Sequence, residues 1–201
     1  MKKAIILLTL VSFVSLVSNA QLRFGVAPGM SMARIAIAGA TGGPLKYKPG
    51  LDGGLFLEAR LSDNFTIQPE ANYSMQGTSV IASDGSTAGS YQFDYLTIPV
   101  LVKMYATKQL NFFAGPQIGI LLSAKTKSST SADVNVKSQL KSTNMYAVFG
   151  AEYCFANGVF ISSRYNLGMQ NIAKTGTTEL KNKYLSFRIG YSCPLGGSTK
   201  K

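Results

Sequence analysis

The sequence contains no histidine, and this absence narrows the chemistry that the chain can perform. Ser–His and Asp–His hydrolytic sites all need an imidazole, and histidine is also the commonest metal ligand. The two cysteines do not form the Cys-x-x-Cys pair of a structural zinc site. A phosphate-binding loop of the Gly-x-x-x-x-Gly-Lys-Ser/Thr type is missing as well. We therefore expect no enzyme, no cofactor and no metal site.

Charge is the second scarce feature. Charged residues make up 14% of the 201-residue chain, whereas about 25% is usual in a soluble domain. The charge that is present is mostly positive, with a formal net charge of +11. A basic chain could bind nucleic acid, but no stretch interleaves aromatic residues with a basic groove in a recognisable motif. An anionic membrane surface or lipopolysaccharide phosphate is the better match.

The first twenty residues have the composition of an export signal. Lys2 and Lys3 give a positive start, residues 4–17 are apolar, and Ser18-Asn19-Ala20 places small residues before Gln21. A membrane anchor is the alternative, but this apolar run is shorter than the roughly 20 residues that span a bilayer. We predict a cleaved signal peptide at 1–20. No later stretch could span a membrane as a helix, so the mature chain is either soluble outside the cytoplasm or crosses a membrane as strands.

The mature sequence alternates between apolar and polar residues. In 65–76, every second residue from Phe65 to Met75 is apolar, and every second residue from Thr66 to Gln76 is polar. Strict alternation of this kind predicts a β-strand, and twelve residues exceed the usual soluble strand. The same pattern predicts eight strands, at 22–32, 54–61, 65–76, 96–105, 111–123, 146–154, 159–167 and 185–192.

The connections between these strands alternate in length. Those at 62–64, 106–109 and 156–158 are tight, whereas those at 33–50, 80–94, 125–144 and 172–182 are long. Short turns at one end and long loops at the other are typical of an outer-membrane barrel. We therefore predict an all-β fold, an eight-stranded antiparallel up-and-down transmembrane β-barrel. It forms one domain at 21–193, followed by a C-terminal tail at 194–201.

The polar face of these strands is light in charge, which favours a barrel interior over a water-facing surface. An eight-stranded barrel is only wide enough for side chains to fill it, so its charges must pair. A structural plug is favoured over a proton or ion path. Catalysis by Glu58, Glu70 and Glu152 is disfavoured because cations share their face. The charged members of the face are Arg23, Glu58, Arg60, Glu70, Lys103, Glu152, Arg164 and Arg188.

Prolines and cysteines give two further expectations. Pro69, Pro99 and Pro116 lie within predicted strands, and each removes one backbone donor, so we expect β-bulges there. Cys154 falls on the inward face and Cys193 on the outward face. Opposed Cβ vectors forbid a disulfide, so both thiols are expected to be free.

Four segments carry a family resemblance: LSDNFTIQPEANYSMQG, YLTIPVLVKMYAT, NFFAGPQIGILLSAK and GVFISSRYNLGMQNI. They resemble the PorT-like outer-membrane β-barrel family of Bacteroidetes, over residues 22–191. The resemblance implies an eight-stranded barrel, often labelled porin-like, of which one branch serves a protein secretion system. These are strand and turn motifs, and they carry no catalytic residue. The usual terminal aromatic is displaced, and residues 191–194 and a basic tail stand in its place.

The third and fourth long loops are basic, which suggests contact with lipopolysaccharide; solvated mobile loops are the alternative. The partners we expect are outer-membrane lipid and lipopolysaccharide, with an envelope protein partner left open and no nucleic acid. Three roles remain: a structural or interaction barrel, a porin-like transporter, and a soluble periplasmic binder of an apolar ligand. The loop cations are Lys125, Lys127, Lys137, Lys141, Lys174, Lys181 and Lys183.

Overall fold

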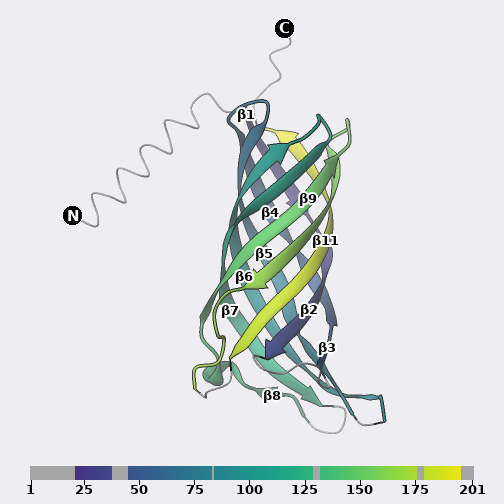
Figure 1. Ribbon diagram of the computed structural model, residues 1–201, viewed down its shortest axis with the longest axis vertical. Helices are drawn as coiled ribbons and strands as arrows, with labels where there is room; N and C mark the ends of the chain where they lie inside the picture. Colours follow the sequence, from purple (N-terminus) through teal and green to yellow (C-terminus); the bar gives the residue numbers. More distant parts are fainter. Residues whose placement is uncertain (1–20, 38–44, 83, 129–131, 176–178, 196–201) are drawn as a thin grey trace, which may run out of the picture.

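The computed structural model describes residues 21–37, 45–82, 84–128, 132–175 and 179–195. In these ranges the chain is mostly β-strand and forms a tall antiparallel barrel (Figure 1). Two short strands, β3 (Leu45–Lys46) and β8 (Val134–Asn135), and the 3-10 helix η1 (Lys137–Gln139) belong to its long connections. The wall consists of β1 (Gln21–Ala27), β2 (Gly29–Ile37), β4 (Lys48–Arg60), β5 (Phe65–Ile81), β6 (Thr87–Tyr105), β7 (Leu110–Ser128), β9 (Thr143–Cys154), β10 (Val159–Gly168) and β11 (Leu180–Pro194).

Strands β1 and β2 act as one strand of the wall. Both pair with β4 on one side and with β11 on the other, and the register continues unchanged past Pro28. The Pro28 carbonyl accepts a hydrogen bond from the Ile189 amide at 3.1 Å. The first strand therefore meets the last, and an eight-stranded ring closes without an unpaired edge, as a bilayer requires. The predicted eight-stranded up-and-down barrel is confirmed.

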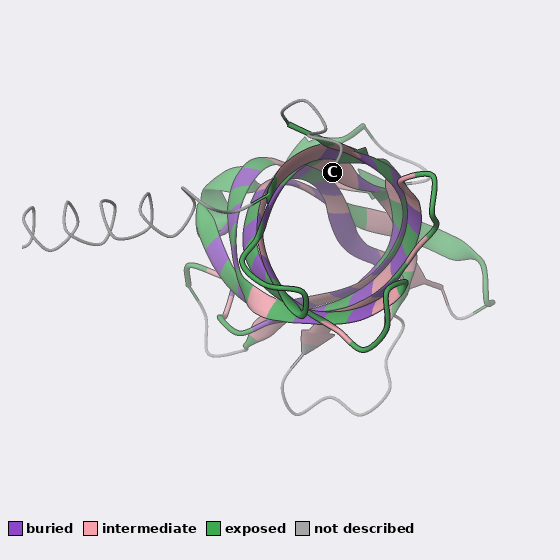
Figure 2. Cartoon of the chain, turned by 90° about the horizontal axis from the view of Figure 1, so that it is seen from above, coloured by how far each residue is buried: buried purple, intermediate pink, exposed green. Residues whose placement is uncertain are grey.

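The two faces of the wall differ as the alternation predicts. On the outside, Phe65 is 46% exposed and Val100 is 41% exposed, whereas Gln68, which points inward, is 1% exposed. Seen from above, buried and exposed bands follow one another along the visible strands of the wall (Figure 2). The outer face of the wall is therefore apolar, and the polar side chains of the alternating pattern point into the bore, which is the arrangement of a membrane barrel.

The wall strands extend beyond their predicted ends. The predicted loop at 80–94 is wrong, because β5 runs to Ile81 and β6 begins at Thr87. The predicted loops at 33–50 and 125–144 are also shorter than predicted, because β2, β4, β7 and β9 extend into them. The fourth connection is shifted, because β10 ends at Gly168 and β11 begins at Leu180. Near the long loops the inner face of the wall is itself partly apolar, with Ile35, Phe93 and Leu121 buried in the bore, so the alternation between apolar and polar residues disappears while the backbone ladder continues.

The bulges expected at the prolines are not at those positions. Pro69 stays opposite Val100, and Pro99 stays opposite Gln117, with no shift of register. Pro116 likewise stays in an unbroken pairing of β7 with β9. A proline removes one hydrogen-bond donor but adds no residue, so the strand loses a bond and keeps its register. The shifts lie instead between Val80 and Ile81 and between Asp94 and Tyr95, nearer the long loops.

Three tight turns connect neighbouring strands at one end of the barrel. The Ser62 hydroxyl accepts hydrogen bonds from the backbone amides of Asn64 and Phe65 in the first turn. In the second turn, the Thr107 hydroxyl accepts hydrogen bonds from the backbone amides two and three residues later. Gly158 adopts φ +86° in the third turn, a conformation that favours glycine. The start of β1 and the end of β11 lie at this end, which is the periplasmic end of an outer-membrane barrel. In the described part of the chain, no helix is long and apolar enough to cross a bilayer.

Candidate functional site

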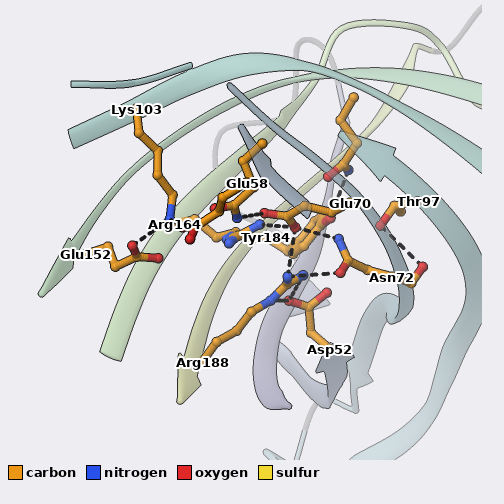
Figure 3. A network of polar contacts seen from close by, with 12 residues as sticks. Asp52, Glu58, Glu70, Asn72, Thr97, Lys103, Glu152, Arg164, Tyr184 and Arg188 are labelled. Atoms are coloured by element: carbon orange, nitrogen blue, oxygen red, sulfur yellow. Dashed lines mark hydrogen bonds and ion pairs between the residues drawn. The ribbon is translucent and has the colours of Figure 1, made fainter. Parts of the chain in front are cut away.

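A fully buried ion cluster occupies the centre of the bore (Figure 3). The Arg188 guanidinium from β11 binds Asp52 Oδ2 of β4 at 2.7 Å and Glu70 Oε2 of β5 at 3.1 Å. Arg164 Nη1 from β10 binds the same Glu70 oxygen at 2.8 Å. Glu70 also accepts hydrogen bonds from Gln68 and Asn72 at 2.7 and 2.8 Å. This cluster, the central cluster, joins four strands across the barrel.

A second cluster lies nearer the tight turns. Lys103 Nζ from β6, which is fully buried, donates to Glu58 Oε1 at 2.9 Å and to Glu152 Oε1 at 2.6 Å. Asn111 Nδ2 adds a hydrogen bond to the same Glu152 oxygen at 3.0 Å. Arg23 Nε lies 3.5 Å from Glu58 Oε2, and its side chain is 37% exposed at the barrel mouth. This cluster, the periplasmic cluster, is thus open to water at one edge.

The structure brings together seven of the eight predicted interior residues, and Arg60 is the exception. Its guanidinium lies 3.9 Å from Asp63 in the first tight turn and 5.4 Å from the ring centroid of Tyr105, and its side chain is 42% exposed. The expectation that Arg60 belongs to the interior network is therefore wrong, because β4 carries it to the rim. Asp52 was missed by the sequence analysis and takes part in its place. The two clusters then hold four carboxylates and four cations, which balances their charge.

Aromatic side chains fill the space beside the ions. Phe56 and Phe160 meet edge to face with centroids 5.5 Å apart, and Lys103 Nζ lies 5.9 and 5.7 Å from their centroids. Tyr146 and Tyr184 form a similar pair at 5.9 Å on the other side of the central cluster. The two phenylalanine rings stabilise the buried ammonium group of Lys103. Together with the tyrosine pair they leave little free volume in an eight-stranded bore.

Two separate cavities lie at the two ends of the bore. One, of about 180 Å³, is lined by residues of the periplasmic cluster and the tight turns, including Arg23, Glu58 and Cys154. The other, of about 390 Å³, lies at the opposite mouth and is mostly apolar, with Phe93, Leu140 and Ile172 in its wall. Four of the residues that line this second cavity belong to a buried apolar cluster, which consists of Ile35, Phe93, Tyr95, Leu121, Ala124, Leu140 and Ile172. The buried ion clusters separate the two cavities.

The seven predicted loop lysines have different surroundings in the structure. Lys137 Nζ donates to the Leu122 carbonyl at 2.8 Å, and Lys174 Nζ donates to the Ser138 carbonyl at 3.0 Å, so both tether the chain locally. Four of the others lie in strands rather than loops: Lys125 and Lys127 in β7, and Lys181 and Lys183 in β11. Lys141 is exposed in the connection that follows η1.

Both cysteines are free, as predicted. The Cys154 thiol faces the interior and lies 3.4 Å from Glu152 Oε1, whereas the Cys193 thiol lies 3.4 Å from the Phe24 carbonyl on the outer side of the wall. Within the described ranges, no three acidic or cysteine side chains gather closely enough to hold a metal ion. Glu58 and Glu152 do approach one another, but Lys103 lies between them.

Comparison with known structures identifies the same architecture. The crystal structure of Ail, the attachment invasion locus protein of Yersinia pestis, matches with a TM-score of 0.52 and 12% identity over 86% of this chain and 99% of that chain. A structure of Ail with the heparin analogue sucrose octasulfate matches with a TM-score of 0.53 and 12% identity, over 86% and 99%. Neisserial surface protein A matches with a TM-score of 0.55 and 11% identity, over 84% and 96%. A comparison with curated protein sequences gave no match.

The match to a family model shows which protein family the chain belongs to. The model described as an outer membrane protein beta-barrel domain matches residues 18–174, which is most of the chain. The outward apolar face and the closed ring fit an outer-membrane location, and they exclude the soluble periplasmic barrel considered from the sequence. The chain therefore belongs to the outer membrane protein beta-barrel domain family and is an integral outer-membrane protein.

Proposed function

We propose that this protein is a closed barrel that neither catalyses a reaction nor conducts ions. Its role is structural, or it binds a partner or ligand through its outer loops and outer wall at the cell surface. The observation that carries the proposal is the pair of buried ion clusters. They cross-link β4, β5, β6, β9, β10 and β11 through contacts of 2.6 to 3.1 Å, at side chains that are at most 8% exposed. An ion moving along the bore would have to break these pairs without replacing their partners, which costs several kcal/mol per buried charge.

Single-channel recording in planar bilayers tests this proposal. The purified protein is expected to give no discrete conductance steps in 1 M KCl, whereas a general porin in the same bilayers supplies the positive control. The double variant Arg164→Ala and Arg188→Ala removes both cations of the central cluster. If it folds, small openings are expected from the variant alone. Regular steps from the wild-type protein would contradict the closed barrel and favour the porin-like alternative.

A second candidate function is the binding of acidic envelope polymers. Positive charge predominates at the long-loop end, and the structural neighbour Ail is known in complex with a heparin analogue, a densely sulfated sugar. Replacing the seven lysines from Lys125 to Lys183 by Gln is expected to weaken lipopolysaccharide co-purification at low salt, because exposed charges attract over about one Debye length. Unchanged retention would remove this candidate.

We also propose the finer relationships that the sequence resemblance implies. The chain would belong to the PorT-like group of Bacteroidetes, and residues 1–20 would be a cleaved signal peptide, although they lie outside the described residues. Edman sequencing of the protein from purified outer membranes should then begin Gln-Leu-Arg, or be blocked by cyclisation of the glutamine. A mature chain that still begins at Met1 would contradict cleavage.

A further inference from the structure

Two cations oppose each other on the outer wall near the long-loop end. Arg34 of β2 and Lys183 of β11 are direct partners in the ladder. Their neighbours along the strands, Met32 and Leu185, belong to the outward apolar face, and Met32 is 41% exposed. The Arg34 guanidinium lies 6.0 Å from the ring centroid of Tyr47, which precedes β4. The pair therefore lies on the outer wall at the edge of the apolar band, where the hydrocarbon of the outer leaflet gives way to head groups.

The chain supplies no carboxylate to this pair. Four of its nine acidic residues lie in the two interior clusters. Asp63 pairs with Arg60, and Glu179 pairs with Lys181 at 3.0 Å. The remaining three are Asp84, which accepts hydrogen bonds from Ser86; Asp94, which accepts one from Gln92; and Asp133, which is exposed.

One donor of the pair also lacks a neutral hydrogen-bond acceptor. Arg34 Nε is buried and has no hydrogen-bond partner in the part of the chain that the structure describes. Like charges placed directly opposite each other across two strands destabilise a sheet. A buried guanidinium donor without an acceptor adds a further cost. An anion from outside the chain would relieve both penalties.

We propose that Arg34 and Lys183, with Tyr47 beside them, form a binding site for a phosphate group of lipid A on the outer wall of the barrel. A guanidinium matches two phosphate oxygens with parallel N–H donors, and the lysine ammonium adds a point charge beside it. The lipid's acyl chains would then lie along the apolar side chains below, including Met32 and Leu185. This inference rests on the proposed contact with acidic envelope polymers and deepens it, because it places the contact on the wall instead of in the loops.

The opposite side of the barrel provides a matched control. Lys125 and Lys127 of β7 are exposed near the same end of the barrel, and Lys125 is the ladder partner of Gln92. The Gln92 amide binds Asp94 Oδ1 at 3.2 Å, so this second basic patch has a carboxylate close by. Removing two charges there changes the net charge of the protein by the same amount as removing Arg34 and Lys183.

The test compares lipid retention by native mass spectrometry of the full protein released from detergent micelles. Bisphosphorylated lipid A is titrated against the wild type, R34Q/K183Q and K125Q/K127Q, with dephosphorylated lipid A as a second ligand. Loss of charge-assisted hydrogen bonds should weaken binding of bisphosphorylated lipid A to R34Q/K183Q by about tenfold or more. Binding to K125Q/K127Q should change by less than about threefold. Heat-modifiable gel mobility checks that each variant is folded.

Each other outcome has a defined meaning. Equal losses in both variants, or equal binding of phosphorylated and dephosphorylated lipid A, would overturn the site. Equal competition by phosphatidylglycerol would overturn the commitment to lipid A. If the seven-lysine variant loses retention while R34Q/K183Q does not, the wall site fails and the general contact with acidic polymers stands. If R34Q/K183Q folds poorly, the conservative R34K variant replaces it in the test. This variant keeps the positive charge but loses the two parallel N–H donors of the guanidinium, so its affinity for bisphosphorylated lipid A should fall by an intermediate amount. Unchanged binding would contradict the proposal.

Discussion

The inner and outer walls of this barrel handle charge in opposite ways. Inside, four carboxylates and four cations lie in two clusters, and most of their contacts are shorter than 3.2 Å. Outside, the apolar band carries large hydrophobic side chains, and the cations Arg34 and Lys183 at its edge have no carboxylate from the described chain. The comparison teaches that a charge in this fold must be paired by whatever surrounds it: other side chains within the bore, and lipid head groups on the wall.

The largest expected effect comes from breaking the central cluster. Arg188→Leu leaves Asp52 without its cation and removes one of two guanidinium groups from Glu70. Removing one partner of a buried ion pair typically costs about 3–5 kcal/mol. Urea unfolding in micelles should show a loss of this size. The double variant with Asp52→Leu should recover part of it, since no unpaired carboxylate then remains at that position; a double variant less stable than Arg188→Leu would contradict the pairing.

A charge placed on the outer band should have the next largest effect. Val100 is 41% exposed on the lipid side of β6, so Val100→Arg should lower the free energy of unfolding by about 2–4 kcal/mol if it lies near the midplane. Thr66→Val on the inner face of β5 serves as the comparison, because the Thr66 side chain is 2% exposed and its hydroxyl has no hydrogen-bond partner in the part of the chain that the structure describes. Its loss should be far smaller, because valine keeps the shape of the side chain and breaks no hydrogen bond. The reverse order of the two effects would show that the walls are exchanged.

The periplasmic cluster should be more tolerant at its open edge. Arg23 is 37% exposed and lies 3.5 Å from Glu58, which keeps its shorter contact with Lys103. Arg23→Gln should therefore reduce the free energy of unfolding by no more than about 1 kcal/mol, as for a solvent-screened pair. Thermal unfolding of this variant beside Arg188→Leu measures the difference between the open and sealed clusters. Equal losses would mean that exposure does not distinguish them.

The smallest effect is expected at the rim. Arg60 lies 3.9 Å from Asp63, whose side chain is fully exposed, so Arg60→Gln should change the free energy of unfolding by less than about 0.5 kcal/mol. The same urea titration can detect a larger change. A loss near that of Arg188→Leu would place Arg60 in the interior network after all.

The sequence predicted the barrel and its faces because alternation persists wherever one face of a strand meets hydrocarbon. It missed Asp52 because Gly53 and Gly54 interrupt that alternation, although Asp52 is an even number of residues from Glu58 and therefore shares its face. It missed Arg34 for a related reason. Strand β2 continues past Met32, into a stretch where polar and apolar residues no longer mark the two faces.

The grouping of charges could not be read from the sequence. Alternation gives the side of the wall on which a residue lies, but not its height along the barrel. Arg60 and Glu58 share a face of β4, yet one reaches the rim while the other binds Lys103. Height depends on the register between neighbouring strands, which long-range pairing fixes.

The central claim, that hydrocarbon surrounds the apolar wall and the polar face is sealed from it, can be tested by fluorescence. The chain has no tryptophan, so one introduced residue is the only source of that signal. Ile118→Trp replaces an outward side chain that is 48% exposed, and Tyr184→Trp replaces an inward one that is 1% exposed. In vesicles of brominated phospholipid, the first variant should be strongly quenched and the second hardly at all. Equal quenching of both, or stronger quenching of the second, would contradict the claim.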